Sequence, residues 1–217
     1  MELNVVDNPV QVATLSFADL KTPEHLARNP MGSSPTFVDQ DRSIGIWESG
    51  AVLTYLLEEY DTQYRLHPRP GVASPTDRAK FLHIQQYITA TVYPFLASWY
   101  LHTLQPPSDQ DEKYLETVAR KWKTLLAPTL VSFCDDNDGP FFLGTTMTAI
   151  DLLAAKPFSN ADSLGVLAEF PKLYNLFTRV KCLPSFSKAY NVASAEDCYQ
   201  CRSMLLVPAA GEATKED

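Results

Sequence analysis

The patterns typical of β-strands lie in the first 47 residues of this chain and nearly vanish after residue 76, where helical patterns dominate. Residues 10–17, 36–38 and 43–47 are short runs rich in apolar and β-branched side chains, as strands are. Residues 63–75 then contain three prolines and a glycine, which is typical of a connection between domains. The sequence therefore predicts a small α/β domain followed by an all-helical domain.

We expect the α/β domain to cover residues 1–62, with 63–75 as a linker, the helical domain to cover 76–200, and 201–217 to form a flexible tail. Prolines stand inside the two longest helical patterns, and because proline removes a backbone hydrogen bond they predict a bend at each. Helices are predicted at 48–60, 77–104 (bent or broken near Pro94), 112–135 (bent near Pro128), 148–158 and 173–180, and again from Pro184.

The composition excludes several classes of protein. The 217 residues carry a net charge of −8, which argues against binding to nucleic acid or to an anionic membrane surface. There is no run of 18 apolar residues and no secretory signal pattern, so we expect a cytoplasmic protein without a membrane span. His25, His67 and His83 lack the spacing of metal ligands; we expect no metal site, and all three at the surface.

Pro35 stands between a turn and a strand, where a proline can hold a cis peptide bond at little cost. Such a bend exposes the backbone amide and carbonyl of Ser34, which can then pair with an extended peptide ligand. The alternative is an ordinary loop proline, and this segment alone favours that alternative.

Glu48 and Ser49 stand where a strand passes into a helix. The amides at the helix start and the Ser49 hydroxyl form a potential carboxylate site, and Glu48 can accept from an ammonium group. Capping of the helix by the same two residues is the alternative, and the sequence leaves both open. Thr148-x-x-Asp151, by contrast, predicts a capping box with a structural role.

Four motifs occur in the order and spacing of one known family. They are the G-x-x-P-x-x-x-D loop from Gly32, the W-E-S-G-A junction from Trp47, the F-L-G…T-x-x-D box ending at Asp151, and the F-P-x-L…P-S-F segment from Phe170. Over roughly residues 10–190 the sequence resembles the cytosolic glutathione transferase superfamily. It is most similar to the fungal Ure2p-like transferases and to those of fungal secondary metabolism.

The resemblance implies a thioredoxin-like N-terminal domain that binds glutathione, a helical domain that binds an apolar electrophile, and a homodimer. Residue by residue, it implies that Glu48 and Ser49 hold the γ-glutamyl end. It further implies that the backbone of Ser34, before a cis Pro35, pairs with the cysteinyl part, and that Lys21 faces the glycine carboxylate.

The same resemblance leaves the thiol-activating residue unassigned. The family has a strand and a helix before the strand that begins here at Val10, and they supply the activator. Only nine residues precede Val10, fewer than a strand–helix–strand crossover needs, so we expect a truncated domain without this unit. Ser33, which replaces a longer polar residue of relatives, Ser34 and Asn8 are the remaining candidate donors.

The aromatic residues of the first long helix border the electrophile pocket in the family, although core packing is the alternative for each of them. They are Tyr87, Tyr93, Trp99, Tyr100 and His102. The sequence thus predicts an enzyme that adds the glutathione thiolate to an apolar electrophile. The product is a conjugate or, after reversible addition, a cis–trans isomer of a polyene or polyketide-like intermediate. The alternative function is a non-catalytic glutathione-binding or regulatory protein.

Overall fold

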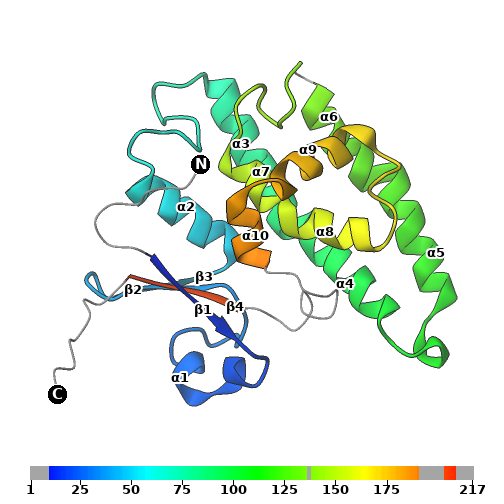
Figure 1. Ribbon diagram of the computed structural model, residues 1–217, viewed down its shortest axis with the longest axis horizontal. Helices are drawn as coiled ribbons and strands as arrows, with labels where there is room; N and C mark the ends of the chain where they lie inside the picture. Colours follow the sequence, from blue (N-terminus) through cyan, green and yellow to red (C-terminus); the bar gives the residue numbers. More distant parts are fainter. Residues whose placement is uncertain (1–9, 136–137, 191–202, 209–217) are drawn as a thin grey trace. The chain divides into compact units, whose positions relative to one another are not determined.

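The structure is a computed structural model, which describes residues 10–135, 138–190 and 203–208. The chain folds as two units (Figure 1). Unit 1 comprises Met1–Gln63 together with Ser187–Asp217, and unit 2 comprises Tyr64–Phe186. Asn8 lies outside the described residues. Within the described ranges, no helix is both long and apolar enough to cross a membrane.

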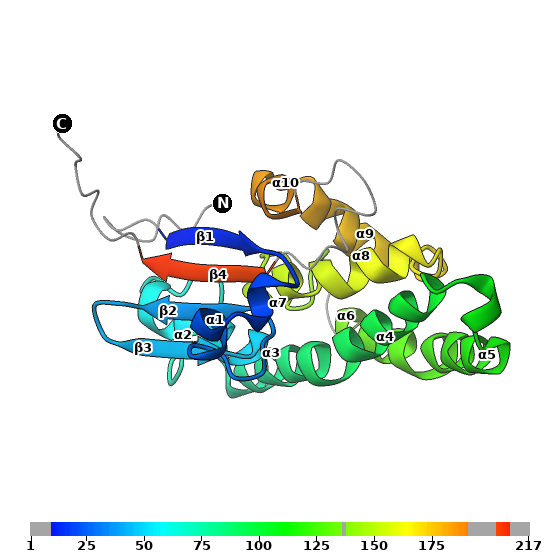
Figure 2. The same ribbon diagram turned by 90° about the horizontal axis from the view of Figure 1, so that it is seen from below.

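Unit 1 contains a four-stranded sheet in the order β1-β4-β2-β3. Its strands are β1 (Val10–Leu15), β2 (Thr36–Asp39), β3 (Ile44–Trp47) and β4 (Ser203–Pro208). Strand β4 runs antiparallel to β1 and parallel to β2, and β2 and β3 form an antiparallel hairpin. Figure 2 shows β4 lying between β1 and β2, so a segment from the end of the chain completes a sheet begun at its start.

The prediction of a flexible tail over 201–217 is therefore wrong for Ser203–Pro208. These residues contain the apolar run Met204–Val207, which suits a strand paired on both sides. The predicted boundaries differ as well, because unit 2 begins at Tyr64, inside the predicted linker. Leu66 is buried there, and its carbonyl accepts from the Ala149 amide at 2.8 Å.

A short 3-10 turn, η1 (Asp19–Lys21), and helix α1 (Pro23–Leu26) connect β1 to β2. The hydroxyl of Thr22 accepts from the amide of His25 at 3.3 Å and caps α1. Pro23 occupies the first helical position, where its missing N–H is not needed. Thr22 and Pro23 thus define the start of helix α1.

Helix α2 (Ser49–Tyr60) follows β3 and buries Val52 and Leu57. Phe37 of β2 is fully buried, and its ring centre lies 5.6 Å from that of Tyr55 on α2. This ring contact joins strand β2 to helix α2. Helix α2 therefore packs on the sheet through side chains at helical spacing.

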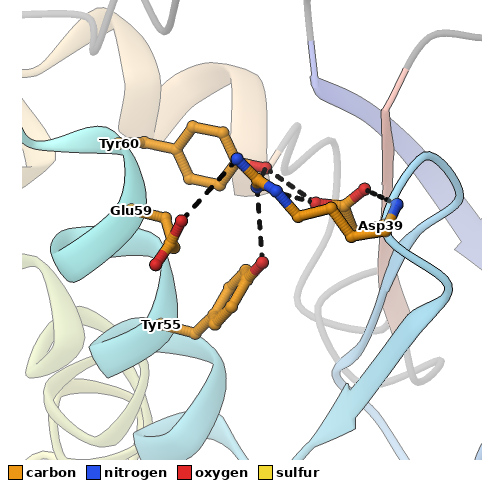
Figure 3. Close-up of polar contacts among 5 residues, drawn as sticks. Asp39, Tyr55, Glu59 and Tyr60 are labelled. Atoms are coloured by element: carbon orange, nitrogen blue, oxygen red, sulfur yellow. Dashed lines mark hydrogen bonds and ion pairs between the residues drawn. The ribbon is translucent and has the colours of Figure 1, made fainter.

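Polar contacts join the β2–β3 turn to α2, and the side chains of Tyr55, Glu59 and Tyr60 project from α2 toward this turn (Figure 3). Asp39, buried at the end of β2, accepts from the amide and Nη1 of Arg42 at 3.1 and 3.0 Å. The Tyr60 hydroxyl donates to the same carboxylate at 3.2 Å, and Arg42 Nη2 lies 3.7 Å from Glu59.

These contacts shift the pKa values of the groups involved. Burial alone would raise the pKa of the Asp39 carboxyl, but the donors of Arg42 and Tyr60 and the Arg42 charge outweigh it, so the pKa lies below its ordinary value. The pKa of Tyr60 is raised, first by burial and then by the Asp39 charge. The cluster therefore stabilises unit 1 with Asp39 ionised.

Unit 2 is helical. Its elements are α3 (Pro75–Tyr87), η2 (Ile88–Val92), α4 (Tyr93–Thr103), η3 (Pro107–Asp109), α5 (Glu112–Lys121), η4 (Trp122–Leu126), α6 (Ala127–Asp135), α7 (Ala149–Leu153), α8 (Ala155–Ser163) and α9 (Pro171–Lys181), and α10 (Pro184–Tyr190) begins in it. Helix α8 packs on α4 and α9, and α9 also contacts α6 and α7. The core is built from large apolar side chains such as Trp122, Phe142, Phe158 and Phe177.

The two predicted bends are π-helical segments with the same layout. Segment η2 ends two residues before Pro94, and η4 ends two residues before Pro128. A proline in a helix lacks the N–H for the carbonyl four residues earlier and collides with it. A wider turn just before the proline accommodates this ring, so each long helix continues across its proline.

The predicted capping box at the start of α7 is confirmed. Asp151 is fully buried and accepts from the amide and hydroxyl of Thr148 at 2.7 and 3.0 Å and from the Phe142 amide at 3.0 Å. Burial nevertheless outweighs these bonds and raises the pKa of Asp151 above its ordinary value. The carboxylate thus joins the loop at Phe142 to α7.

Candidate functional site

The loop before β2 has the bend that the sequence predicts, because the Ser34–Pro35 peptide bond is cis. Ser34 is half-buried, and among the described residues its amide and carbonyl make no hydrogen bond. Native proteins pair nearly all buried backbone groups, so an unpaired amide and carbonyl at a half-buried residue are unusual. The two groups of Ser34 are therefore available to a ligand next to strand β2.

The buried side chains of Asn29 and His25 bind the backbone of this loop. Asn29 is fully buried, and its Nδ2 donates to the Ser33 carbonyl at 2.8 Å and to the Thr36 hydroxyl at 3.0 Å. His25 Nε2 lies 3.0 Å from the same Ser33 carbonyl. The prediction of surface positions is therefore wrong for His25 and His67, which are only 4% and 3% exposed. The roles of His25 and Asn29 in holding the Ser33 carbonyl were not predicted from the sequence, although the two residues stand four positions apart just before the loop.

Lys21 lies at the edge of the same loop. Its Nζ donates to the Gly32 carbonyl at 2.9 Å, and its side chain remains exposed. Gly32 has a φ of +56°, and a Cβ there would lie 2.8 Å from Lys21 Nζ and 2.9 Å from the Leu20 carbonyl oxygen. Glycine is thus required for this approach, which fixes a positive charge beside the loop.

The start of α2 is strained and uncapped. Glu48 has φ 80° and ψ 121°, which lies outside the regions that residues with a Cβ normally occupy. Its exposed side chain makes no capping hydrogen bond, and the first turn of α2 holds no acidic residue. Ser49 is half-buried, and its hydroxyl has no partner among the described residues. Capping therefore does not account for these two residues, and strain of this kind tends to cluster at functional sites.

The hairpin register brings the two motifs together. Thr36 pairs with Trp47, so the residues next to them in the chain, Pro35 and Glu48, lie at the same end of the hairpin. This end carries backbone donors and acceptors from Ser34, a carboxylate from Glu48 and the N-terminus of α2. Such an arrangement suits a small peptide-like ligand that bears both an ammonium and a carboxylate group.

The predicted electrophile-pocket residues have separate surroundings. Trp99 and Tyr100 are buried in the core of unit 2, whereas Tyr93 is 37% exposed. The Tyr87 hydroxyl donates to the Leu126 carbonyl at 3.5 Å, and burial raises the pKa of Tyr87. His102 Nε2 accepts from the Asp111 amide at 2.8 Å. The pocket stays a prediction, with Tyr93 the most accessible of the five.

Two adjacent clefts in unit 2 are lined by other residues, and both include Asn175 and Arg179 of α9. One of them also reaches Cys134. Burial raises the pKa of the Cys134 thiol to about 12, so this thiol stays protonated at neutral pH and is a poor nucleophile.

Comparison with protein families identifies the class of protein. The N-terminal domain of the glutathione S-transferases matches residues 3–58, and their C-terminal domain matches residues 91–191. The chain therefore belongs to the glutathione transferase superfamily, with a thioredoxin-like N-terminal domain and a helical C-terminal domain.

Several individual relatives are fungal. The chain is 28% identical over 192 residues to the glutathione S-transferase-like protein tpcF of Aspergillus fumigatus, which covers 84% of each protein. It is 26% identical to the glutathione S-transferase-like protein gedE of Aspergillus terreus over 79% of each. Among solved structures, the glutathione transferase URE2P6 of Phanerochaete chrysosporium, in complex with oxidized glutathione, shares the fold with a TM-score of 0.69 at 19% identity. That match covers 82% of this chain and 81% of the other.

Proposed function

We propose that this protein is a glutathione-dependent enzyme that adds the glutathione thiolate to an apolar electrophile. The observation that carries the proposal is the Thr36–Trp47 pairing, which joins the cis-proline loop and the start of α2 at one end of the hairpin. Both motifs present polar groups without a partner in the described structure, and the superfamily to which the chain belongs supports glutathione as the ligand.

Each polar group has a counterpart on glutathione. The Glu48 carboxylate accepts from the α-ammonium group, and Ser49 with the start of α2 binds the α-carboxylate. The amide and carbonyl of Ser34 pair with the cysteinyl backbone as an added strand would. Lys21, already beside the loop at Gly32, faces the glycine carboxylate.

The reaction forms a bond between the glutathione sulfur and an electrophilic carbon. If a leaving group departs or a proton is added, the conjugate is released. If the sulfur instead adds to a conjugated alkene and leaves after bond rotation, the product is the cis–trans isomer and glutathione is regenerated. The names of the fungal relatives, both glutathione S-transferase-like, support glutathione as the co-substrate. We further propose that the enzyme is a cytoplasmic homodimer and that its electrophile is a polyene or polyketide-like intermediate.

A second candidate function is glutathione binding without catalysis. A cysteine thiol with a pKa near 8.5 is only a few per cent ionised at pH 7, so catalysis needs a donor close to the sulfur. The Ser33 hydroxyl accepts from Asn29 at 3.3 Å and keeps its own hydrogen to donate, so Ser33 and Ser34 are both candidate donors within the described loop. The binding protein is favoured if neither hydroxyl activates the thiol.

Calorimetric titration with reduced glutathione tests the proposal. We expect Glu48→Ala and Ser49→Ala each to raise the dissociation constant at least about tenfold, because each removes a charge-assisted contact. Glu58→Ala, an exposed position on the same helix, is the matched control and should leave the constant unchanged. An aryl halide and a conjugated polyene are then assayed with glutathione.

The outcomes separate the two functions. Turnover of either substrate supports the enzyme, and its product distinguishes conjugation from isomerisation. Tight binding without turnover, unchanged in Ser34→Ala, supports the binding protein. Absence of binding at millimolar glutathione contradicts both.

A further inference from the structure

We propose that His25 is a positioning residue of this site, which sets the direction of the Ser34 amide through the Ser33 carbonyl. The proposal rests on the proposed glutathione site and identifies a residue that orients the Ser34 amide, a backbone donor of that site. Its first support is the geometry of the histidine itself. His25 Nε2 lies 3.0 Å from the Ser33 carbonyl oxygen in a side chain that is only 4% exposed.

This contact fixes the tautomer of the imidazole. A carbonyl oxygen only accepts, so Nε2 must carry the hydrogen. The other ring nitrogen, Nδ1, is buried and has no hydrogen-bond partner among the described residues. An unsatisfied buried nitrogen is costly, and a leucine or phenylalanine of similar size would avoid that cost. The Nε2–H donor is therefore the feature that this position supplies.

Peptide planarity carries the effect of His25 to Ser34. The Ser33 carbonyl and the Ser34 amide belong to one rigid peptide unit, and this bond is trans. In a trans peptide the C=O and N–H point in opposite directions. By holding the carbonyl toward the buried side, His25 turns the Ser34 N–H away from it, toward the position proposed for the cysteinyl part of glutathione.

The contacts of Asn29 distinguish a positioning role of His25 from a role in folding the loop. It donates to the same Ser33 carbonyl at 2.8 Å, and it also bonds the Thr36 hydroxyl and accepts from the Met31 amide at 3.0 Å. Asn29 therefore connects several parts of the loop, whereas the ring of His25 bonds only Ser33 among the residues that the structure describes. Removal of the His25 donor should leave the loop in place but allow its peptide unit to rock.

Three substitutions at position 25 in the full chain test the proposal. His25→Phe keeps the volume and removes the donor. His25→Gln places an amide nitrogen near the position of Nε2, whereas the shorter His25→Asn does not reach it. We expect Phe and Asn to raise the dissociation constant of glutathione about five- to tenfold and Gln to stay within about threefold of wild type. His83→Phe, an exposed histidine of α3, is the matched control with no expected change.

A second measurement does not depend on glutathione. Nitrogen-15 NMR of the imidazole should show a proton on Nε2 of His25 and none on Nδ1, and nitrogen-15 relaxation of the Ser34 amide should show increased motion in His25→Asn. If wild type does not bind glutathione, the proposed function fails, while these spectra still report on the contact between His25 and the Ser33 carbonyl. If wild type binds and His25→Asn binds equally well, or if Nδ1 carries the proton, His25 is not a positioning residue. Should His25→Phe fail to fold, the Asn and Gln pair decides.

Discussion

The two units draw on the chain in different ways. Unit 2 is one continuous stretch, Tyr64–Phe186, whose helices begin and bend at residues with local signals. The sheet of unit 1 takes three strands from the first 47 residues and β4 from the other end of the chain. In the order β1-β4-β2-β3, β1 joins the sheet only through β4. Local sequence thus suffices for unit 2, whereas unit 1 depends on a pairing between distant segments.

Deletion of residues 203–217 should have the largest effect, and only in unit 1. Without β4, β1 has no sheet partner and β2 loses one of its two neighbours. We expect the free energy of unfolding of unit 1 to fall by about 5 kcal/mol or more. Residue-resolved hydrogen exchange would show loss of protection in β1 and β2 but not in α8 or α9. Deletion of 209–217 leaves β4 in place and is the control; protected β1 amides in the longer deletion would contradict the strand order.

Asp151→Ala should produce the largest single-residue effect, and in unit 2. The change leaves the amides of Thr148 and Phe142 without their acceptor in the core. Each unsatisfied buried donor costs about 1–3 kcal/mol, so we expect a loss of about 3 kcal/mol in urea unfolding. Asp162→Ala removes only a half-exposed ion pair with Lys181 and should cost less than about 1 kcal/mol. Equal effects of the two substitutions would mean that the capping box is not a core contact.

The sequence predicted features that depend on short spacings. The irregular helix segments before Pro94 and Pro128 and the box at Asp151 each need only residues within a few positions of one another. Burial of His25 was not predictable in this way, because its partner is a backbone carbonyl that the sequence does not display.

Strand β4 and the aromatic residues of α4 illustrate the same limit. The pairing of β4 depends on strands far away in the chain. Trp99 is buried, whereas Tyr93 on the same helix is exposed, because packing of the neighbouring helices decides which face is covered. Of the candidate site, the sequence indicated the residues that point outward but not the buried pair that holds them.

Acid should act on the two units with opposite sign. The pKa of Asp39 in unit 1 lies below its ordinary value of 3.8, so its contribution is present above pH 3.8 and is lost as the pH falls through the lower folded-state pKa. The pKa of Asp151 in unit 2 is raised, so its contribution declines as the pH rises from 3.8 through the higher folded-state pKa.

Asp39→Asn and Asp151→Asn test this contrast. At neutral pH we expect Asp39→Asn to cost about 2 kcal/mol, because Arg42 and Tyr60 lose an ionised acceptor. Urea unfolding is measured between pH 2 and 6 and is followed by NMR signals of each unit. The free energy of unfolding of unit 1 should decrease less with falling pH in Asp39→Asn than in wild type. In Asp151→Asn, by contrast, the free energy of unfolding of unit 2 should decrease more steeply with falling pH than in wild type. An unchanged pH dependence in either variant would show that the carboxyl does not titrate with folding.

The smallest expected effect is a gain in stability, and it contrasts the helix starts of the two units. Thr148 begins α7 in an extended conformation with a complete capping box, whereas Glu48 begins α2 with φ 80° and no cap. Glu48→Gly and Glu48→Ala both remove the carboxylate, but only glycine accepts this backbone without strain. We expect Glu48→Gly to be more stable than Glu48→Ala by about 1 kcal/mol in thermal unfolding, and both to lose glutathione affinity equally. Because the two variants differ only in a methyl group, equal stability would mean that the backbone at position 48 is not strained, and the side chain alone would then account for the presence of glutamate there.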